Sequence, residues 1–93
     1  MLLKLPSVLT HDQASDCSRS LKLAVQAASA DQGRVIADAS SMTVFDSSAL
    51  AVLLDCRREA LVMGHTFWVQ GLPPRLRQLA GLYGIASLIP SPA

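Results

Sequence analysis

The chain has 93 residues, which is enough for one domain and too few for a second hydrophobic core. Apolar residues make up 51% of it, charged residues 16%, and the net charge is +1, which excludes a disordered tail and a general nucleic-acid binder with a basic stripe. Because so few charges leave more apolar surface than usual, we expect a protein partner to cover part of the domain.

The sequence also indicates a compartment. No apolar run reaches the roughly 20 residues that cross a bilayer, so we expect no direct membrane insertion. Residues 1–6 are too short for the core of a signal peptide and have no cleavage site, which favours the cytoplasm. Cys17 and Cys56 have no Cys-x-x-Cys partner, and two free thiols are expected in a reducing compartment.

The first third of the chain predicts a strand and a helix. Residues 2–5 are expected to form a short strand that Pro6 ends. Thr10 and Gln13 have the spacing of a capping box, in which the two residues satisfy each other's backbone N–H groups. Apolar residues then recur at spacings of three and four, which predicts an amphipathic helix over about 11–28.

The middle of the chain predicts a buried strand and a second helix. Residues 35–37 form a continuous apolar run, the pattern of a parallel strand covered on both faces. Val44-Phe45 leads into the polar motif Asp46-Ser47-Ser48-Ala49. A helix is expected over about 47–63, apolar all round in its first two turns and charged in its last two. Gly64 is a natural residue to follow its end.

The last third predicts a strand over 66–70, a turn at Pro73-Pro74 and a short helix that ends at Gly84. Residues 85–89 are expected to add a last strand. Strands and helices thus alternate along the chain, which predicts an α/β fold with a mostly parallel sheet and right-handed crossovers.

The polar motif at the start of the second helix has several possible uses. Asp46 is a good N-cap, since its carboxylate can accept the N–H of Ser48 or Ala49 and its charge suits the helix dipole. Ser47 and Ser48 fall in the first turn, where a phosphate would add about −1.5 to −2 charge at a positive helix end. From spacing alone, a plain cap is the favoured interpretation.

A family resemblance changes that balance. Residues 35–50 resemble the core of STAS domains, in which an apolar strand, an Asp and a polar loop precede Asp-Ser/Thr-Ser/Gly-Gly-Leu at the start of an apolar helix. Residues 64–72 and 79–85 resemble the next strand with its turn and the third helix of that family. The resemblance covers residues 34–89. It implies a single STAS-like domain over residues 1–93, with about four mostly parallel or mixed strands and helices packed largely on one face.

Among STAS domains, the chain is most similar to the small subunit of the Mla phospholipid transporter, because its N-terminal strand region is short and contains a proline. This implies a non-enzymatic cytoplasmic subunit, peripheral to the inner membrane only through its partner. It would bind and regulate or stabilise the ATPase of an Mla-type ABC transporter that maintains outer-membrane lipid asymmetry. The docking surface would include the third helix and these partner-binding residues: Phe45, Asp46, Ser47, Ser48, Ala49 and Leu50.

The alternative is an anti-sigma-factor antagonist. Ser48 matches the position that a partner kinase phosphorylates in those proteins, whereas Ser47 matches the hydroxyl that the Mla subunit presents to its ATPase. Ala49 replaces the glycine that the family places after the hydroxyl pair, which keeps the phosphorylation hypothesis second.

The remaining candidates point to no chemistry. A hydrolase using Ser48 would need Gly-x-Ser-x-Gly and a nearby histidine, and nothing in the sequence supplies either, because His11 and His65 are expected in solvated turns. No His/Cys pair has ligand spacing and no glycine-rich loop is present, so we expect no catalytic residue, cofactor or metal. Trp68 is expected in the core.

Overall fold

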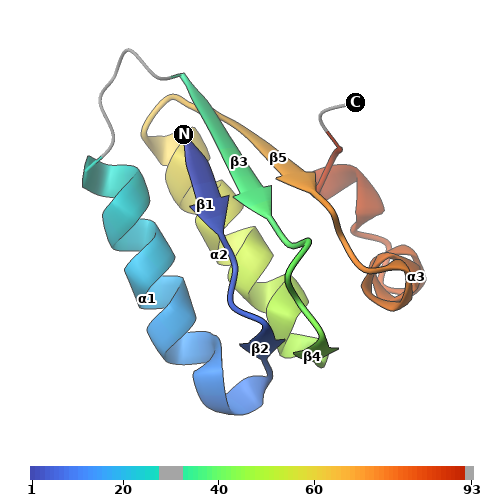
Figure 1. Ribbon diagram of the computed structural model, residues 1–93. Helices are drawn as coiled ribbons and strands as arrows, with labels where there is room; N and C mark the ends of the chain where they lie inside the picture. The colour runs from blue at the N-terminus through green and yellow to red at the C-terminus, as the bar shows by residue number, and fades with distance from the viewer. Residues whose placement is uncertain (28–32, 92–93) are drawn as a thin grey trace.

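The computed structural model describes residues 1–27 and 33–91. This part of the chain forms five strands, three α-helices and one 3₁₀ helix (Figure 1). In chain order they are β1 Leu2–Lys4, β2 Val8–Leu9, α1 His11–Ala27, β3 Arg34–Asp38, β4 Val44–Phe45, α2 Ser48–Val62, β5 Thr66–Gln70, α3 Pro74–Leu82 and η1 Ala86–Leu88. Residue 28, where the first helix was expected to end, lies outside the described residues. No helix in the described part has the length and hydropathy of a membrane span.

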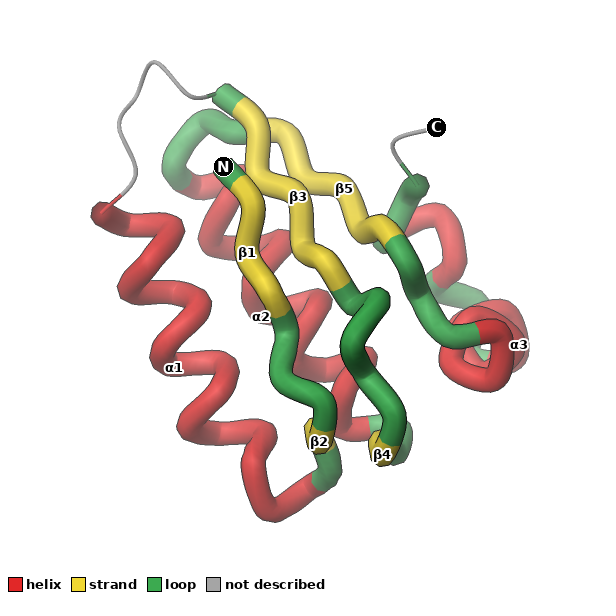
Figure 2. The backbone as a smooth tube through the Cα atoms, in the orientation of Figure 1, coloured by secondary structure: helices red, strands yellow, loops and turns green. Residues whose placement is uncertain are grey.

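The strands form two small parallel sheets. β3 lies between β1 and β5, and β2 pairs with β4 over two residues. Figure 2 shows the β2–β4 pair below the three-stranded sheet, at the ends of the loops that follow β1 and β3. The predicted α/β fold is therefore confirmed, but its strands are divided between two sheets. Two-residue strands leave no periodic pattern in a sequence, and this pairing was missed.

Helices α1 and α2 lie side by side behind the three-stranded sheet, while α3 lies beyond its β5 edge (Figure 1). One half of the first capping prediction is confirmed, because the side-chain oxygen of Gln13 accepts the N–H of Thr10 at 2.9 Å. The other half is not, since the Thr10 hydroxyl donates to that same oxygen at 2.7 Å and the N–H of Gln13 donates to the carbonyl of Thr10. The core fills the space between the sheet and the helices. Its largest fully buried side chains are Leu9, Val25, Val35, Val52, Leu53, Cys56, Val69 and Leu76.

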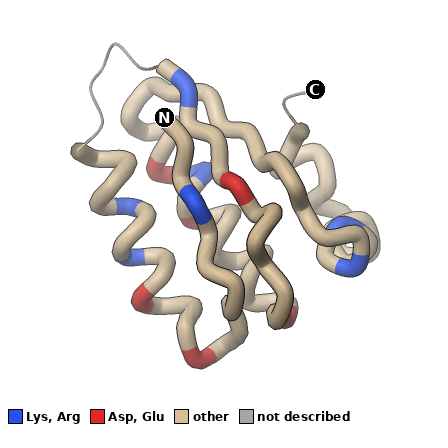
Figure 3. Tube along the Cα trace, viewed as in Figure 1, with Lys and Arg blue, Asp and Glu red and all other residues tan. Residues whose placement is uncertain are grey.

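The opposite face of the three-stranded sheet is open, so the expectation that residues 35–37 are covered on both faces was wrong. Val35 and Ala37 are buried, but Ile36 between them is only half-buried. Ile36 pairs in register with Leu2 and Trp68, which form one apolar row across the open face. Trp68 is therefore half-buried on this face rather than in the core, with its indole Nε1–H donating to the Thr66 hydroxyl at 3.3 Å. Charged residues flank this row on the same face, where Lys4 of β1 and Arg34 and Asp38 of β3 lie at alternate positions (Figure 3).

The expected last strand is wrong as well, because residues 86–88 form the 3₁₀ helix η1. Gly84 has a φ of 70°, and the N–H of Ile85 returns to the carbonyl of Ala80. The segment then uses its own N–H groups in tight turns, with Leu88 donating to Ile85. The carbonyl of Pro90 then accepts the N–H of Val69 at 2.8 Å, which links the end of this segment to β5.

His65 was expected in a solvated turn and is instead 4% exposed. Gly64, with a φ of 80°, reverses the chain after α2, and the N–H of His65 donates to the carbonyl of Ala60 at 2.8 Å. In the alternation of β5, His65 precedes Phe67 and Val69 on the covered side of the sheet. Neither ring nitrogen has a hydrogen-bond partner among the described residues.

Candidate partner-binding site

The carboxylate of Asp46 joins the starts of two helices. Its Oδ1 accepts the N–H of Ser48 at 2.8 Å, as the capping argument predicts. Its Oδ2 accepts the N–H of His11, the first residue of α1, at 3.0 Å. This second bond was not predicted, since His11 is 35 residues earlier in the chain and no local pattern links the two. One side chain thus fixes the geometry of both helix N-termini.

The electrostatics of Asp46 follow from those bonds. The N–H of Ser48 is the largest cause of a lowered pKa for this carboxyl, and the N–H of His11 is the second. The charged form also lies at the positive ends of two helix dipoles, where an anion is favoured. Asp46 is therefore negatively charged at neutral pH.

The two serines differ in exposure. Ser47 is the N-cap residue of α2, one position later than expected, and in the described structure its exposed side chain makes no capping bond. Its hydroxyl is available to a partner. Ser48 is half-buried and borders a shallow hollow of about 260 Å³ whose lining includes His11, Ser18 and Asp55.

That hollow corrects the argument that nothing places a histidine near Ser48. The β2–β4 pairing brings the start of α1 beside the start of α2, and His11 comes with it. His11 nevertheless offers Asp46 its backbone N–H rather than its ring, so the three residues do not reproduce the hydrogen-bond order of a Ser-His-Asp triad.

Ala49 and Leu50 are 0% and 2% exposed. They belong to the core and hold the start of α2 from inside. The accessible part of the six predicted partner-binding residues is therefore formed by Phe45, Asp46, Ser47 and Ser48, of which Ser47 is the most open.

A groove of about 470 Å³, here called the motif groove, lies between these residues and α3. One wall is formed by Phe45, Asp46 and Ser47, and the other by Arg75, Gln78, Leu79, Leu82 and Tyr83. Leu82 and Tyr83 are 81% and 58% exposed. The third helix was expected in the docking surface, but these side chains were not predicted, because the register between α3 and the motif is set by tertiary packing.

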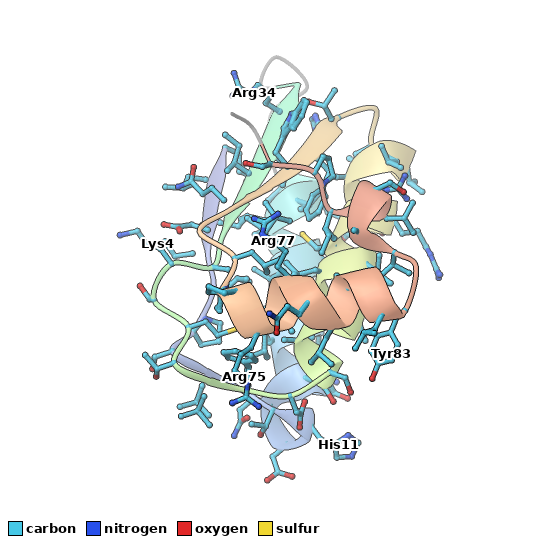
Figure 4. The ribbon with its side chains drawn as sticks, turned by 90° about the vertical axis from the view of Figure 1, so that its right-hand side faces the viewer. Lys4, His11, Arg34, Arg75, Arg77 and Tyr83 are labelled. Atoms are coloured by element: carbon cyan, nitrogen blue, oxygen red, sulfur yellow. The ribbon has the colours of Figure 1, made fainter. Side chains whose placement is uncertain are left out.

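Figure 4 shows how the basic side chains of α3 are distributed. Arg75 and Tyr83 extend on one side of the helix, and Arg77 extends on the other. Both arginines are exposed, and because they extend on different sides of the helix they form no joint basic patch. Only Arg75 contributes to the motif groove.

The loop that precedes the motif is positioned by a close backbone approach. Gly71 has a φ of 68°, and a Cβ atom placed on it would lie 2.7 Å from the Cβ of Ser40. Ser40 in turn donates its hydroxyl to Asp38 at 2.6 Å and its N–H to the same oxygen at 3.0 Å. These bonds, the hydroxyl first, lower the pKa of Asp38. Glycine at position 71 allows this loop to rest on the turn that leads to α3.

Comparison with known proteins agrees with this geometry. The family profile described as "Mlab, STAS domain" matches residues 1–90, nearly the whole chain. No curated protein matches the chain. The resemblance noted around the Asp-Ser-Ser motif is thus confirmed at the level of the family. The chain belongs to the STAS domain family, in the group that the profile describes as Mlab.

Proposed function

We propose that the protein is a non-enzymatic subunit that docks on the ATPase of an Mla-type phospholipid ABC transporter and regulates or stabilises it. The observation that carries the proposal is the motif groove, in which the free hydroxyl of Ser47 lies beside exposed Leu82 and Tyr83. Membership of the Mlab group supports the choice of partner. The protein would act in the cytoplasm and reach the inner membrane only through this ATPase.

The chemistry of the groove suits a protein partner. Tyrosine and arginine are enriched at the centres of protein interfaces, and both are present here as Tyr83 and Arg75. Leu82 offers apolar surface that an isolated domain gains nothing from exposing. Ser47 and Asp46 add polar groups that would fix the orientation of the bound chain.

Co-expression with the ATPase subunit of an Mla-type phospholipid transporter tests this proposal. We expect a stable complex with the wild-type protein and a loss of affinity of about tenfold or more for Leu82→Glu, since that change places a charge in the contact. Leu23→Glu is the matched control, because Leu23 is 59% exposed on α1, away from the groove. If two soluble chains form no complex, or if both variants bind equally well, the proposal fails.

The second candidate is an anti-sigma-factor antagonist switched at Ser48. The position of Ser48 favours it, because a phosphate there would lie next to the charged carboxylate that holds its own N–H. The two negative groups would repel each other and disturb the start of α2. Incubation with a candidate anti-sigma-factor kinase and ATP, followed by intact-mass measurement, tests this, with Ser48→Ala as the control. A subunit that docks on an ATPase tolerates Ser48→Ala, whereas a phosphorylation switch loses its off state.

A further inference from the structure

The C-terminal end of α2 has an unusual surface. Leu61, Val62 and the following Met63 are 47%, 74% and 41% exposed. Consecutive residues of a helix point in different directions. Three exposed apolar residues in a row therefore show that the core does not surround this end of the helix. A helix end that only met water would place polar residues there. This end of α2 therefore carries an apolar surface that the domain itself does not cover.

The surface is hollowed rather than flat. Leu54, Leu61 and Val62 of α2 and Leu88 of η1 line a cavity of about 330 Å³, and Arg57 and Arg58 border it. We call this cavity the arginine groove. It is lined by α2 from Leu54 onward, whereas the motif groove lies at the start of that helix, and the two grooves share no lining residue.

The charges of α2 are divided between two sides of the helix. Its two acidic residues both bond to α1: Asp55 accepts the hydroxyl of Ser18 at 2.9 Å, and Glu59 accepts the amide of Gln26 at 2.7 Å. Arg57 and Arg58 lie on the groove side. In the described part of the chain, the ion pair that forms is between Arg19 and Asp16, and neither groove arginine takes part in one. The groove therefore has positive charge beside an apolar floor and no internal counter-charge.

We propose that the arginine groove binds an acidic amphipathic segment of a protein partner, in which an apolar side chain enters the cavity and carboxylates meet Arg57 and Arg58. Charge complementarity selects the acidic partner, because an arginine guanidinium can bind a carboxylate through two parallel hydrogen bonds. The concave shape favours a protruding peptide side chain, which can fill the cavity. The proposal does not depend on the motif groove or on the ATPase.

The experiment uses a fluorescein-labelled helical peptide of about 14 residues with leucines at i, i+3, i+4 and i+7 and glutamates elsewhere. We expect the wild-type protein to raise its fluorescence anisotropy, with an affinity that falls as salt is added. Arg57→Glu and Val62→Glu should each weaken binding by about tenfold or more. Amide chemical shifts of labelled protein should change around Leu61 and Leu88. Arg77→Glu is the matched control, since it reverses an exposed arginine that lines neither groove and should leave peptide binding unchanged.

Several results would overturn the proposal. A peptide with lysine in place of glutamate that binds equally well would remove the charge argument. No binding of the glutamate peptide, or equal losses with Arg57→Glu and Arg77→Glu, would remove the site. Phosphatidylglycerol vesicles that bind through Arg57 while the peptide does not would assign the surface to a membrane. If the wild-type protein sediments as a dimer and Val62→Glu dissociates that dimer, the surface would be assigned to contact with a second copy of the chain. Circular dichroism of each variant confirms that it is folded before these comparisons are made.

Discussion

The two faces of the three-stranded sheet are built from the same strands and both carry apolar side chains, yet only one is covered. On the face toward α1 and α2, Val35, Ala37 and Val69 are 1%, 0% and 1% exposed. On the other face, Ile36 and Trp68 are half-buried and Leu2 is 52% exposed. The difference follows from the placement of the helices, since α3 lies beyond the edge of the sheet instead of across its open face (Figure 1). An apolar side chain in a strand therefore does not by itself indicate which face is buried.

The largest expected effect compares aromatic residues on the two faces. Phe67→Ala, on the covered face, should lower the free energy of unfolding by about 3–5 kcal/mol, because it leaves a cavity in the core. Trp68→Ala, next to it on the open face, should cost clearly less, because water already reaches that ring. Urea unfolding followed by circular dichroism measures both. Equal losses would mean that the open face is covered in solution.

The second prediction concerns Gly71, in the turn that directly follows β5. Gly71→Ala should lower the free energy of unfolding by more than the roughly 1–2 kcal/mol that a left-handed residue costs, since the added Cβ also meets Ser40. Gly64→Ala is the matched control, because Gly64 has a positive φ but no atom within 4 Å of an added Cβ. If thermal unfolding finds the two variants equally stable, the close approach to Ser40 is not tight.

The third prediction concerns the polar residue on the covered face. His65→Leu should leave the free energy of unfolding unchanged or raise it by up to about 1 kcal/mol, because it removes two buried ring nitrogens without hydrogen-bond partners among the described residues. Chemical unfolding at neutral pH measures the change. A large loss of stability would show that the ring makes a polar contact in solution, and His65→Gln, which retains polar atoms, would then be less damaging.

The smallest expected effect on stability concerns Asp46, which directly follows β4, and it depends on pH. The pKa of Asp46 is lowered in the folded protein, so its charge adds stability above the unfolded value of about 3.9, and this stability is lost as pH falls through the folded pKa. The wild type should therefore be more stable than Asp46→Asn at neutral pH, and the difference should close in acid. Asp38 titrates in both proteins, so subtraction isolates Asp46. A difference that persists at low pH would contradict the assignment of this stability to the charge of Asp46.

Much of the fold was predictable because the signals are local. The spacing in α1, the glycine after α2 and the Gln13 cap each depend on a few neighbouring residues. The β2–β4 pair was not, since Val8 pairs with Val44 and the whole of α1 and β3 lies between them in the sequence. Nor was η1, because apolar residues 85–89 fit a strand as well as a tight turn, and only the reversal at Gly84 decides between them.

The candidate site was likewise predictable only where it depends on neighbouring residues in the sequence. The bond from Asp46 to the N–H of Ser48 follows from the cap pattern. The burial of Ala49 and Leu50 does not, since it depends on how the start of α2 meets the core. The wall provided by Leu82 and Tyr83 depends on the angle of α3, and His65 resembles a solvated residue because its neighbours in the sequence are polar or glycine.

The bond between Asp46 and His11 has a consequence for the order of folding. It closes a loop of 35 residues, and contacts at such separation carry a large entropy cost that must be met before they add stability. We expect α2 to form with its local Ser48 bond first and to gain the His11 bond only when the β2–β4 pair closes. Ser47 would then reach its final position in the last steps of folding. A partner that recognises it would bind the completed domain and pass over chains that are still partly folded.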